Sequence, residues 1–75
     1  MIEEAEAFLV AQGFGQLRVR FHGNIARIEV HKEEMGKILD QQTAIAGTFK
    51  SLGFCYVTLD LEGYRSGSMD EVLKE

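Results

Sequence analysis

The sequence predicts a small α+β domain, ferredoxin-like in part, with a three-stranded, mainly antiparallel sheet and helices on one face of that sheet. Two patterns predict this class: some segments place apolar residues at helical spacing, and others alternate strictly between apolar and polar residues. In addition, the 75 residues contain no proline and no Gly/Ser-rich linker. We therefore expect one domain, residues 1–75, with the element order α-β-β-α-β-α.

The first half of the chain predicts a helix and then a hairpin. Residues 2–12 carry apolar residues at helical spacing and stop before Gly13, a residue suited to a helix C-terminus. Residues 16–22 and 25–30 alternate, and Gly23-Asn24 between them suits a two-residue turn. That turn fixes a register in which the apolar side chains share one face. The expected pairs are Leu17 with Val30, Arg18 with Glu29, Val19 with Ile28, Arg20 with Arg27 and Phe21 with Ala26.

The second half predicts helix, strand and helix. Residues 35–52 suit one broken helix or two short ones, with Asp40 as the cap of the second segment and Gly53 at its end. Residues 54–62 alternate again and form the third expected strand. Ser68 and Glu71 fit a capping box that opens a short last helix through Leu73. The side chains expected to point inward from the third strand are Cys55, Val57, Leu59 and Leu61.

Two parts of the chain share one pattern, in which an apolar helix end is followed by Gly-Phe and an alternating strand. The two dipeptides are Gly13-Phe14 and Gly53-Phe54, and only the buried face of the pattern repeats, which packing explains. A right-handed crossover from the second strand to the third, over the hairpin partner, places the first strand in the middle of the sheet.

The composition narrows the class of function. A hydrophobic content of 45% with 27% charged residues is typical of a globular protein, and the net charge of -4 argues against general binding of nucleic acids or anionic membranes. The single cysteine, Cys55, cannot form an internal disulfide, and the sequence shows neither a signal-peptide pattern nor an apolar run of membrane-spanning length. We expect a cytoplasmic protein with no nucleic-acid or membrane partner.

The polar side of the expected sheet is unusually ionic for three strands. Arg20 faces Arg27 across the hairpin, and two guanidinium groups so placed repel by about 0.2–1 kcal/mol unless an anion lies between them. That anion is either a carboxylate of the neighbouring strand or a bound phosphate or carboxylate ligand, and both alternatives are open. The residues expected on this face are Arg18, Arg20, His22, Arg27, Glu29, Thr58, Asp60 and Glu62.

Other candidate groups give weaker signals. Residues 63–67 precede an expected helix and include Arg65, which suits either an anion-binding turn or plain helix capping. Glu29, with Asp60 and Glu62, could hold Mg²⁺, although salt bridges to the arginines explain these carboxylates as well. No metal-ligand or nucleophile arrangement emerges, so we assign no catalytic residue and no chemical role to His22, His31 and Cys55.

Residues 17–22 (LRVRFH), 25–29 (IARIE) and 56–69 (YVTLDLEGYRSGSM) together resemble a known family. The chain is similar, from about Glu6 to Leu73, to the C-terminal region of the LarE-type ATP-dependent sacrificial sulfur transferases, which are PP-loop ATP pyrophosphatase-like enzymes. The resemblance implies an enzyme that adenylates a carboxylate of a pyridinium mononucleotide and inserts sulfur from its own cysteine. The product is the organic part of a nickel-pincer cofactor.

The resemblance also implies roles for individual residues. By position, Arg18 and Arg20 match the arginines that bind the phosphate or carboxylate of the substrate. Glu29 matches an acidic residue of the same site that is associated with metal, and Glu6 falls where the family has another site glutamate. Lys37 stands near an acidic position of the family and departs from the pattern there.

The sequence lacks the parts of the family that carry out the chemistry. It contains no Ser-Gly-Gly-x-Asp-Ser loop for ATP, and Cys55 does not match the sulfur-donating cysteine, which the family has upstream. We expect no cofactor in this chain, and ATP and Mg²⁺ only together with a PP-loop ATPase domain, in cis or in trans. The chain is then a non-catalytic substrate-binding and assembly domain that presents Arg18, Arg20, Arg27 and Arg65 to a pyridinium mononucleotide-like ligand.

The alternative is a structural oligomerisation or docking module without a small-molecule ligand. Its ionic face or a sheet edge would meet a second copy, as a homo-oligomer, or the ATPase domain. An independent enzyme ranks last among the expectations.

Overall fold

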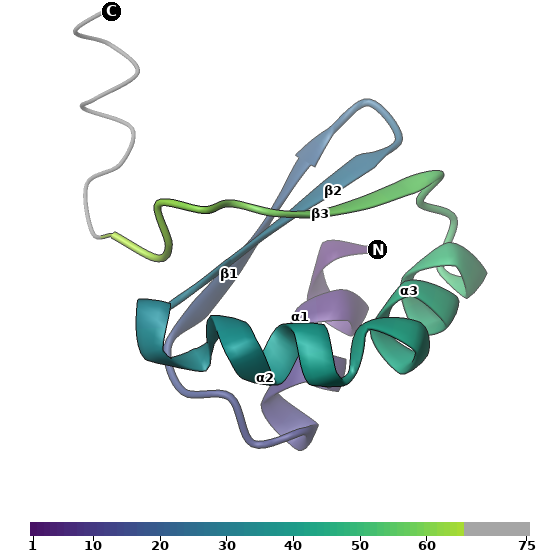
Figure 1. Cartoon of the computed structure of the whole chain (residues 1–75). Helices are drawn as coiled ribbons and strands as arrows, with labels where there is room; N and C mark the ends of the chain where they lie inside the picture. Colours follow the sequence, from purple (N-terminus) through teal and green to yellow (C-terminus); the bar gives the residue numbers. More distant parts are fainter. Residues whose placement is uncertain (66–75) are drawn as a thin grey trace, which may run out of the picture.

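The computed structural model describes residues 1–65, in which the helices lie together on one face of a three-stranded sheet (Figure 1). This arrangement confirms the α+β class. The last expected helix, residues 68–73, lies outside the described residues. Within residues 1–65 we find no helix long and apolar enough to cross a membrane. The elements are α1 (Ile2–Ala11), β1 (Leu17–His22), β2 (Ile25–Val30), the 3₁₀ turn η1 (Lys32–Glu34), α2 (Met35–Asp40), α3 (Gln42–Ser51) and β3 (Tyr56–Leu59).

The β1–β2 hairpin has the register that the sequence predicts. Val19 pairs with Ile28, and Arg20 pairs with Arg27. The apolar side chains therefore face the helices, and the arginines project from the opposite, open face of the sheet. Gly23 has a φ of 59°, and within residues 1–65 only glycines have a positive φ. The turn thus needs glycine at the first of its two positions and not at Asn24.

The strand order is β1-β2-β3, so the prediction that the first strand is central, as in ferredoxin-like folds, was wrong. β2 is antiparallel to β1 and parallel to β3, and the antiparallel ladder is the longer one. The outer edge of β1 is already occupied, because the Glu6 carboxylate in α1 accepts a hydrogen bond of 2.9 Å from the Val19 amide. The crossover through α2 and α3 therefore returns the chain beside β2.

The repeated Gly-Phe dipeptides end two helices in the same way. At the end of α3, Gly53 has a φ of 112°, and the Phe54 amide donates to the Phe49 carbonyl at 3.2 Å. This bond and the accompanying contact of the two phenylalanine rings, with centroids 5.7 Å apart, are those of a Schellman motif. Gly13 and Phe14 end α1 with the same pair of features, a positive φ and a bond back to the last turn. The repeat is therefore a helix-ending device that leads the chain into β1 and β3.

Three local expectations differ from the structure. Asp40 is the last residue of α2 and caps nothing, since α3 begins after Gln41 and has no side-chain cap. Cys55 is exposed, because β3 begins only at the next residue and Cys55 still belongs to the preceding turn. Leu61 is 78% exposed, because β3 ends at Leu59 and the chain turns directly afterwards. The predicted strand was too long at both ends.

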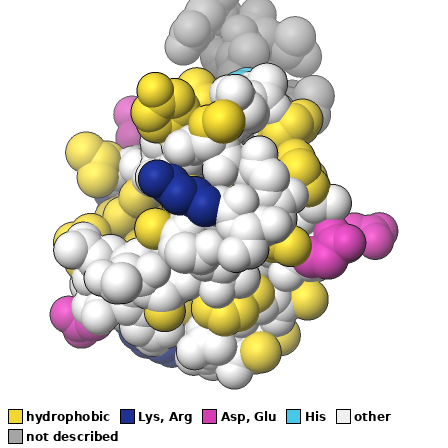
Figure 2. All heavy atoms as spheres, turned by 90° about the vertical axis from the view of Figure 1, so that its right-hand side faces the viewer, with side chains coloured by type: hydrophobic (Ala, Val, Ile, Leu, Met, Phe, Trp, Pro, Cys, Tyr) yellow, Lys and Arg dark blue, Asp and Glu magenta, His cyan; other side chains and the backbone are white. Residues whose placement is uncertain are grey.

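Several apolar side chains reach the surface near the end of the hairpin. Figure 2 shows the side of the molecule that carries α3 and this end, with hydrophobic side chains emerging at separate places. Phe21 is 48% exposed, Ile25 37% and Tyr56 64%. Phe21 keeps an edge-on ring contact with Phe54 at a centroid distance of 5.6 Å, so its inner side still belongs to the core.

The segment 60–65 follows β3 and continues along β2. The Asp60 amide donates to the Ile28 carbonyl at 2.9 Å, and the Tyr64 amide donates to the Val30 carbonyl at 2.8 Å. Between these two bonds Gly63 is buried, with a φ of 84°. A Cβ at this position would lie 2.9 Å from the Val30 carbonyl oxygen, so only glycine lets the segment lie against β2.

We expect Gly63→Ala to lower the free energy of unfolding by about 2 kcal/mol, because it combines a left-handed backbone with a backbone clash. Urea-induced unfolding measures the change. Gly47→Ala is the matched control: Gly47 lies in the exposed interior of α3 with nothing within 4 Å of an added Cβ. That variant should stabilise the protein by up to about 1 kcal/mol. Equal stability of the two variants would show that segment 60–65 does not depend on Gly63.

Candidate anion-binding site

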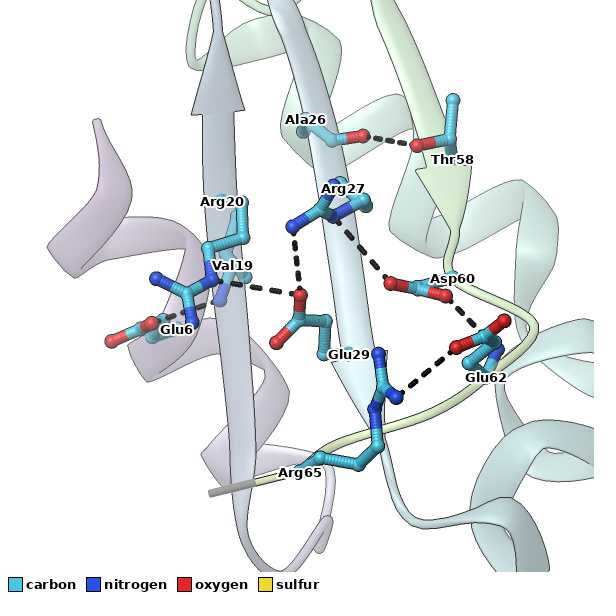
Figure 3. Close-up of polar contacts among 10 residues, drawn as sticks. All are labelled: Glu6, Val19, Arg20, Ala26, Arg27, Glu29, Thr58, Asp60, Glu62 and Arg65. Carbon is cyan, nitrogen blue, oxygen red and sulfur yellow. Dashed lines mark hydrogen bonds and ion pairs between the residues drawn. The ribbon is translucent and has the colours of Figure 1, made fainter. Parts of the chain in front are cut away.

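The open face of the sheet carries a cluster of alternating charges, which we call the arginine cluster. It consists of Arg18, Arg20, Arg27 and Arg65 with the carboxylates of Glu29, Asp60 and Glu62. Figure 3 shows most of these side chains on the face of the sheet opposite the helices. At its centre, one oxygen of Glu29, Oε2, lies 3.0 Å from Arg27 Nη2 and 3.5 Å from Arg20 Nε.

Glu29 is buried although it points to the open face. It is 1% exposed, and of the two roles that the sequence left open for it, a salt bridge to the arginines is the one seen in the structure. Glu29 lies on the central strand, Arg20 and Arg27 flank it, and Figure 3 shows the side chain of Arg65 from segment 60–65 running beside it. Because burial of a charged carboxylate is costly unless it is paired, the guanidinium groups are required for this position.

In the structure, carboxylates offset the repulsion between Arg20 and Arg27 across the hairpin. The sequence offers Asp60 and Glu62 of the neighbouring strand as countercharges, but the principal one is Glu29 from β2 itself. Asp60 contributes a longer contact, 3.6 Å from its Oδ2 to Arg27 Nε. Glu62 instead forms an ion pair with Arg65, with 3.1 Å between Glu62 Oε1 and Arg65 Nη1. The two facing arginines are thus bridged by one shared carboxylate oxygen.

Arg18 is the most available arginine of the cluster. Its Cα lies opposite Glu29 in the hairpin register, and its side chain is exposed on the same face as Arg20. Within residues 1–65 the Arg18 side chain has no hydrogen bond or ion pair. Arg27 contacts the two acids through Nε and Nη2, so within residues 1–65 its Nη1 group is also open to a ligand. Guanidinium groups with open N–H donors are the usual protein ligands of phosphate and carboxylate groups.

Glu6 is a structural residue that the sequence pattern did not single out, apart from the family resemblance. It lies on α1, is partly buried, and accepts the hydrogen bond from Val19 described above. Figure 3 shows its carboxylate next to Arg20 at the edge of the cluster. The buried residues of α1 are Ala5 and Leu9, and the helical periodicity of the sequence does not distinguish Glu6 from other polar residues of the helix. Periodicity alone therefore does not predict the contact with Val19.

The metal role of Glu29 stays a prediction. Within residues 1–65 no three His, Cys, Asp or Glu side chains lie together in a way that could hold a metal ion. One oxygen of Glu29 is held by two guanidinium groups, and the other, Oε1, is buried and has no hydrogen-bond partner among residues 1–65. Lys37, at the position where the sequence departs from the family pattern, binds the Gly13 carbonyl and covers the Phe14 ring.

The remaining sequence candidates lie away from the cluster's centre. His31 packs its ring against Tyr64 at a centroid distance of 5.5 Å, and its Nε2 lies 3.1 Å from Gln16 Oε1. Cys55 is contacted by the Asn24 amide at 3.2 Å and has no histidine or carboxylate partner within residues 1–65. These groups are held by structural contacts.

Comparison with known proteins identifies relatives over nearly the whole chain. No protein-family model matches it. The chain is 48% identical, over 69 residues and 92% of its length, to the pyridinium-3,5-bisthiocarboxylic acid mononucleotide synthase of Lactiplantibacillus plantarum, of which it covers 25%. Uncharacterized proteins of Synechocystis sp. and Methanocaldococcus jannaschii are each 42% identical, over 96% and 87% of the chain.

The chain therefore resembles one segment of these relatives and spans about a quarter of their length, 25–28%. The similarity supports the family resemblance seen in the sequence at the level of this segment. Its matched length includes the hairpin, the third strand and segment 60–65, which together carry the arginine cluster, because only 6 of the 75 residues lie outside the 69 matched to the synthase.

A double-mutant cycle of Arg27→Gln and Glu29→Gln tests whether the shared carboxylate holds the cluster together. We expect Glu29→Gln alone to cost about 2 kcal/mol of unfolding free energy, less than for a fully buried pair because the arginines are partly exposed. The coupling energy of the pair should be about 1 kcal/mol. Urea unfolding of the four proteins of the cycle measures it.

The Arg65–Glu62 pair provides the control cycle. Its side chains are 37% and 71% exposed, so the coupling energy should be close to zero. If the two cycles give the same coupling energy, Glu29 does not act as a buried bridge.

Proposed function

We propose that this chain is the substrate-binding and assembly segment of a PP-loop-type, ATP-dependent sulfur transferase of nickel-pincer cofactor synthesis. In this role the arginine cluster holds the phosphate or a carboxylate of a pyridinium mononucleotide. The 48% identity to a segment of a pyridinium mononucleotide synthase supports the assignment of the ligand class. Residues 17–22, 25–29 and 56–69, which carry the family resemblance, belong to the same similarity.

The observation that carries the proposal is the exposed Arg18 beside two arginines that are already held in place. One oxygen of Glu29 forms ion pairs with both Arg20 and Arg27, so their guanidinium groups are oriented before a ligand binds. Arg18 has no competing acid within residues 1–65. An anion bound at Arg18 can therefore also reach the outer N–H groups of a fixed neighbour, which provides a charged and oriented site.

The chemistry of sulfur transfer is assigned to other parts of such an enzyme. The sequence has no Ser-Gly-Gly-x-Asp-Ser loop, so ATP and Mg²⁺ belong to a PP-loop ATPase domain that works with this segment in cis or in trans. The role of the present chain is to bind and orient the mononucleotide. It provides no nucleophile of its own to this proposed reaction.

We expect Arg18→Gln to weaken binding of inorganic phosphate and of nicotinic acid mononucleotide about tenfold, because a charge-assisted contact is lost. NMR titration of the full chain, followed at the amide and guanidinium signals of Arg18, Arg20 and Arg27, measures the affinity. Lys50→Gln is the matched control, since it removes the same charge from an exposed position on α3. Its affinity should stay within about twofold of the original protein.

Two results would contradict the proposal. Equal weakening by Arg18→Gln and Lys50→Gln would indicate a general effect of net charge rather than a site. Titration to saturating phosphate and mononucleotide without movement of the three arginine signals would remove the binding role altogether.

Self-association is the second candidate function, and one surface favours it. The residues of α2, α3 and β3 form an apolar groove of about 480 Å³ beside the outer edge of β3. The Tyr56 amide donates to the Asn24 carbonyl in the turn before β2, and the Asp60 amide donates to the Ile28 carbonyl in β2. The alternate residues Val57 and Leu59 therefore direct their peptide groups away from the sheet. Within residues 1–65 no strand pairs with this edge.

The edge of β3 complements a second copy of itself. A two-fold axis at Thr58 sets Val57 against Leu59 of the second copy, so both outward peptide groups pair and both apolar side chains stay on the helix side. It also brings the exposed Leu39 of each copy, 58% accessible, toward the joint groove. We propose a second copy of this chain as the occupant of the groove.

Leu39→Lys should abolish this dimer, because it places two like charges in the apolar groove. Val10→Lys is the control: Val10 lies on α1 and is 59% exposed, almost the same as Leu39. Analytical ultracentrifugation should show a dimer for the original chain and for Val10→Lys, and a monomer for Leu39→Lys. A concentrated original chain that sediments as a monomer excludes this candidate.

A further inference from the structure

The open face of the sheet has a second row of side chains next to the arginine cluster. In the strand register His22 pairs with Ile25, and Ile25 pairs with Tyr56. The following row consists of Arg20, Arg27 and Thr58 in the same order across the sheet. Because side chains two residues apart on a strand share a face, both rows project from the open side. The Tyr56 row and the arginine row are therefore immediate neighbours.

Tyr56 offers an unused aromatic surface in its row. It is 64% exposed, and within residues 1–65 its side chain takes part in no hydrogen bond or ring contact. The other tyrosine, Tyr64, is half-buried and stacks edge-on with His31. Ile25, 37% exposed, lies opposite Tyr56 and extends the apolar surface around it. A large exposed ring that has no aromatic partner and no polar partner within residues 1–65 is open to a ligand on its face.

The distance between the two rows suits one small ligand. Neighbouring rows on a strand are roughly 7 Å apart, and Tyr56 is diagonal to Arg27 across the β2–β3 pair. Thr58 follows Tyr56 on this face of β3 and lies beside Arg27. Its short side chain donates a hydrogen bond to the Ala26 carbonyl at 2.8 Å. No bulky side chain of β3 therefore separates the aromatic surface from the guanidinium groups.

We propose that Tyr56 stacks on the aromatic ring of a mononucleotide whose phosphate or carboxylate is held by Arg18, Arg20 and Arg27. This inference rests on the proposed function and adds a subsite that recognises the aromatic ring of the ligand. Aromatic side chains on an open sheet face are a common platform for nucleotide rings. A pyridinium ring is favoured further, because its positive charge is attracted to the electron-rich face of tyrosine. The site then distinguishes a pyridinium mononucleotide from other phosphate esters.

A comparison of three probes tests the ring subsite separately from the phosphate subsite. The probes are nicotinic acid mononucleotide, ribose 5-phosphate, which lacks the ring, and inorganic phosphate. We expect the full chain to bind nicotinic acid mononucleotide about tenfold more tightly than ribose 5-phosphate, as measured by NMR titration. Tyrosine fluorescence of the Tyr64→Phe variant reports Tyr56 alone, since the chain has two tyrosines and no tryptophan. Only the ring-containing probe should quench it.

The variants separate stacking from a general loss of structure. Tyr56→Ala should remove the tenfold preference and leave the affinity for ribose 5-phosphate unchanged, whereas Tyr56→Phe should keep the preference because the ring face remains. Val10→Ala, an equally exposed apolar truncation on α1, should change neither affinity. Amide spectra of each variant establish that the sheet is intact.

Each outcome decides one proposal. Equal affinities for the mononucleotide and ribose 5-phosphate, or equal weakening of both by Tyr56→Ala, would overturn the stacking role while phosphate binding by the arginines stands. Absence of binding by all three probes would overturn the proposed function and the ring subsite together. A ring preference that disappears with Tyr56→Ala and survives Tyr56→Phe supports the inference.

Discussion

The contact between one carboxylate oxygen of Glu29 and two opposed guanidinium groups is the constraint on which the open face depends. Without it, Arg20 and Arg27 would repel each other across the hairpin, and a buried acid would have no partner. With it, the arginines are directed along the sheet surface rather than into bulk solvent. One residue on the central strand therefore determines both the local stability of the hairpin and the geometry of the candidate site.

The topology creates this position. Because β2 is central, Glu29 has β1 on one side, and segment 60–65, which extends the parallel side past the end of β3, on the other. Gly63 permits that extension by lying directly against the backbone of β2. Fold and site are thus connected through the peptide backbone: the path of the chain after β3 covers the acid that organises the arginines.

Local features could be predicted from the sequence, and features that join distant segments could not. The alternation of residues 16–30 and the Gly23-Asn24 turn were sufficient for the complete hairpin register, and Gly13 and Gly53 marked the helix ends. The strand order was predicted wrongly because it joins segments far apart in the sequence, and contacts such as that of Glu6 with Val19 at the β1 edge have no local pattern. The burial of Glu29 could not be predicted for a similar reason. Alternation with a period of two residues assigns a side chain to one face of the sheet, but it does not show which other residues cover that face. The exposure of Cys55 follows from a strand boundary, the least certain part of any assignment from pattern.

The hydrogen bond from Val19 to Glu6 also limits how the sheet can grow. It occupies a donor that a strand added beside β1 would need, so within residues 1–65 the β3 edge is the more accessible side for extension. A sheet with one accessible border can be completed by a single additional strand but cannot elongate in both directions. Growth through a two-fold contact at β3 would therefore end at a pair, because each copy uses that edge once.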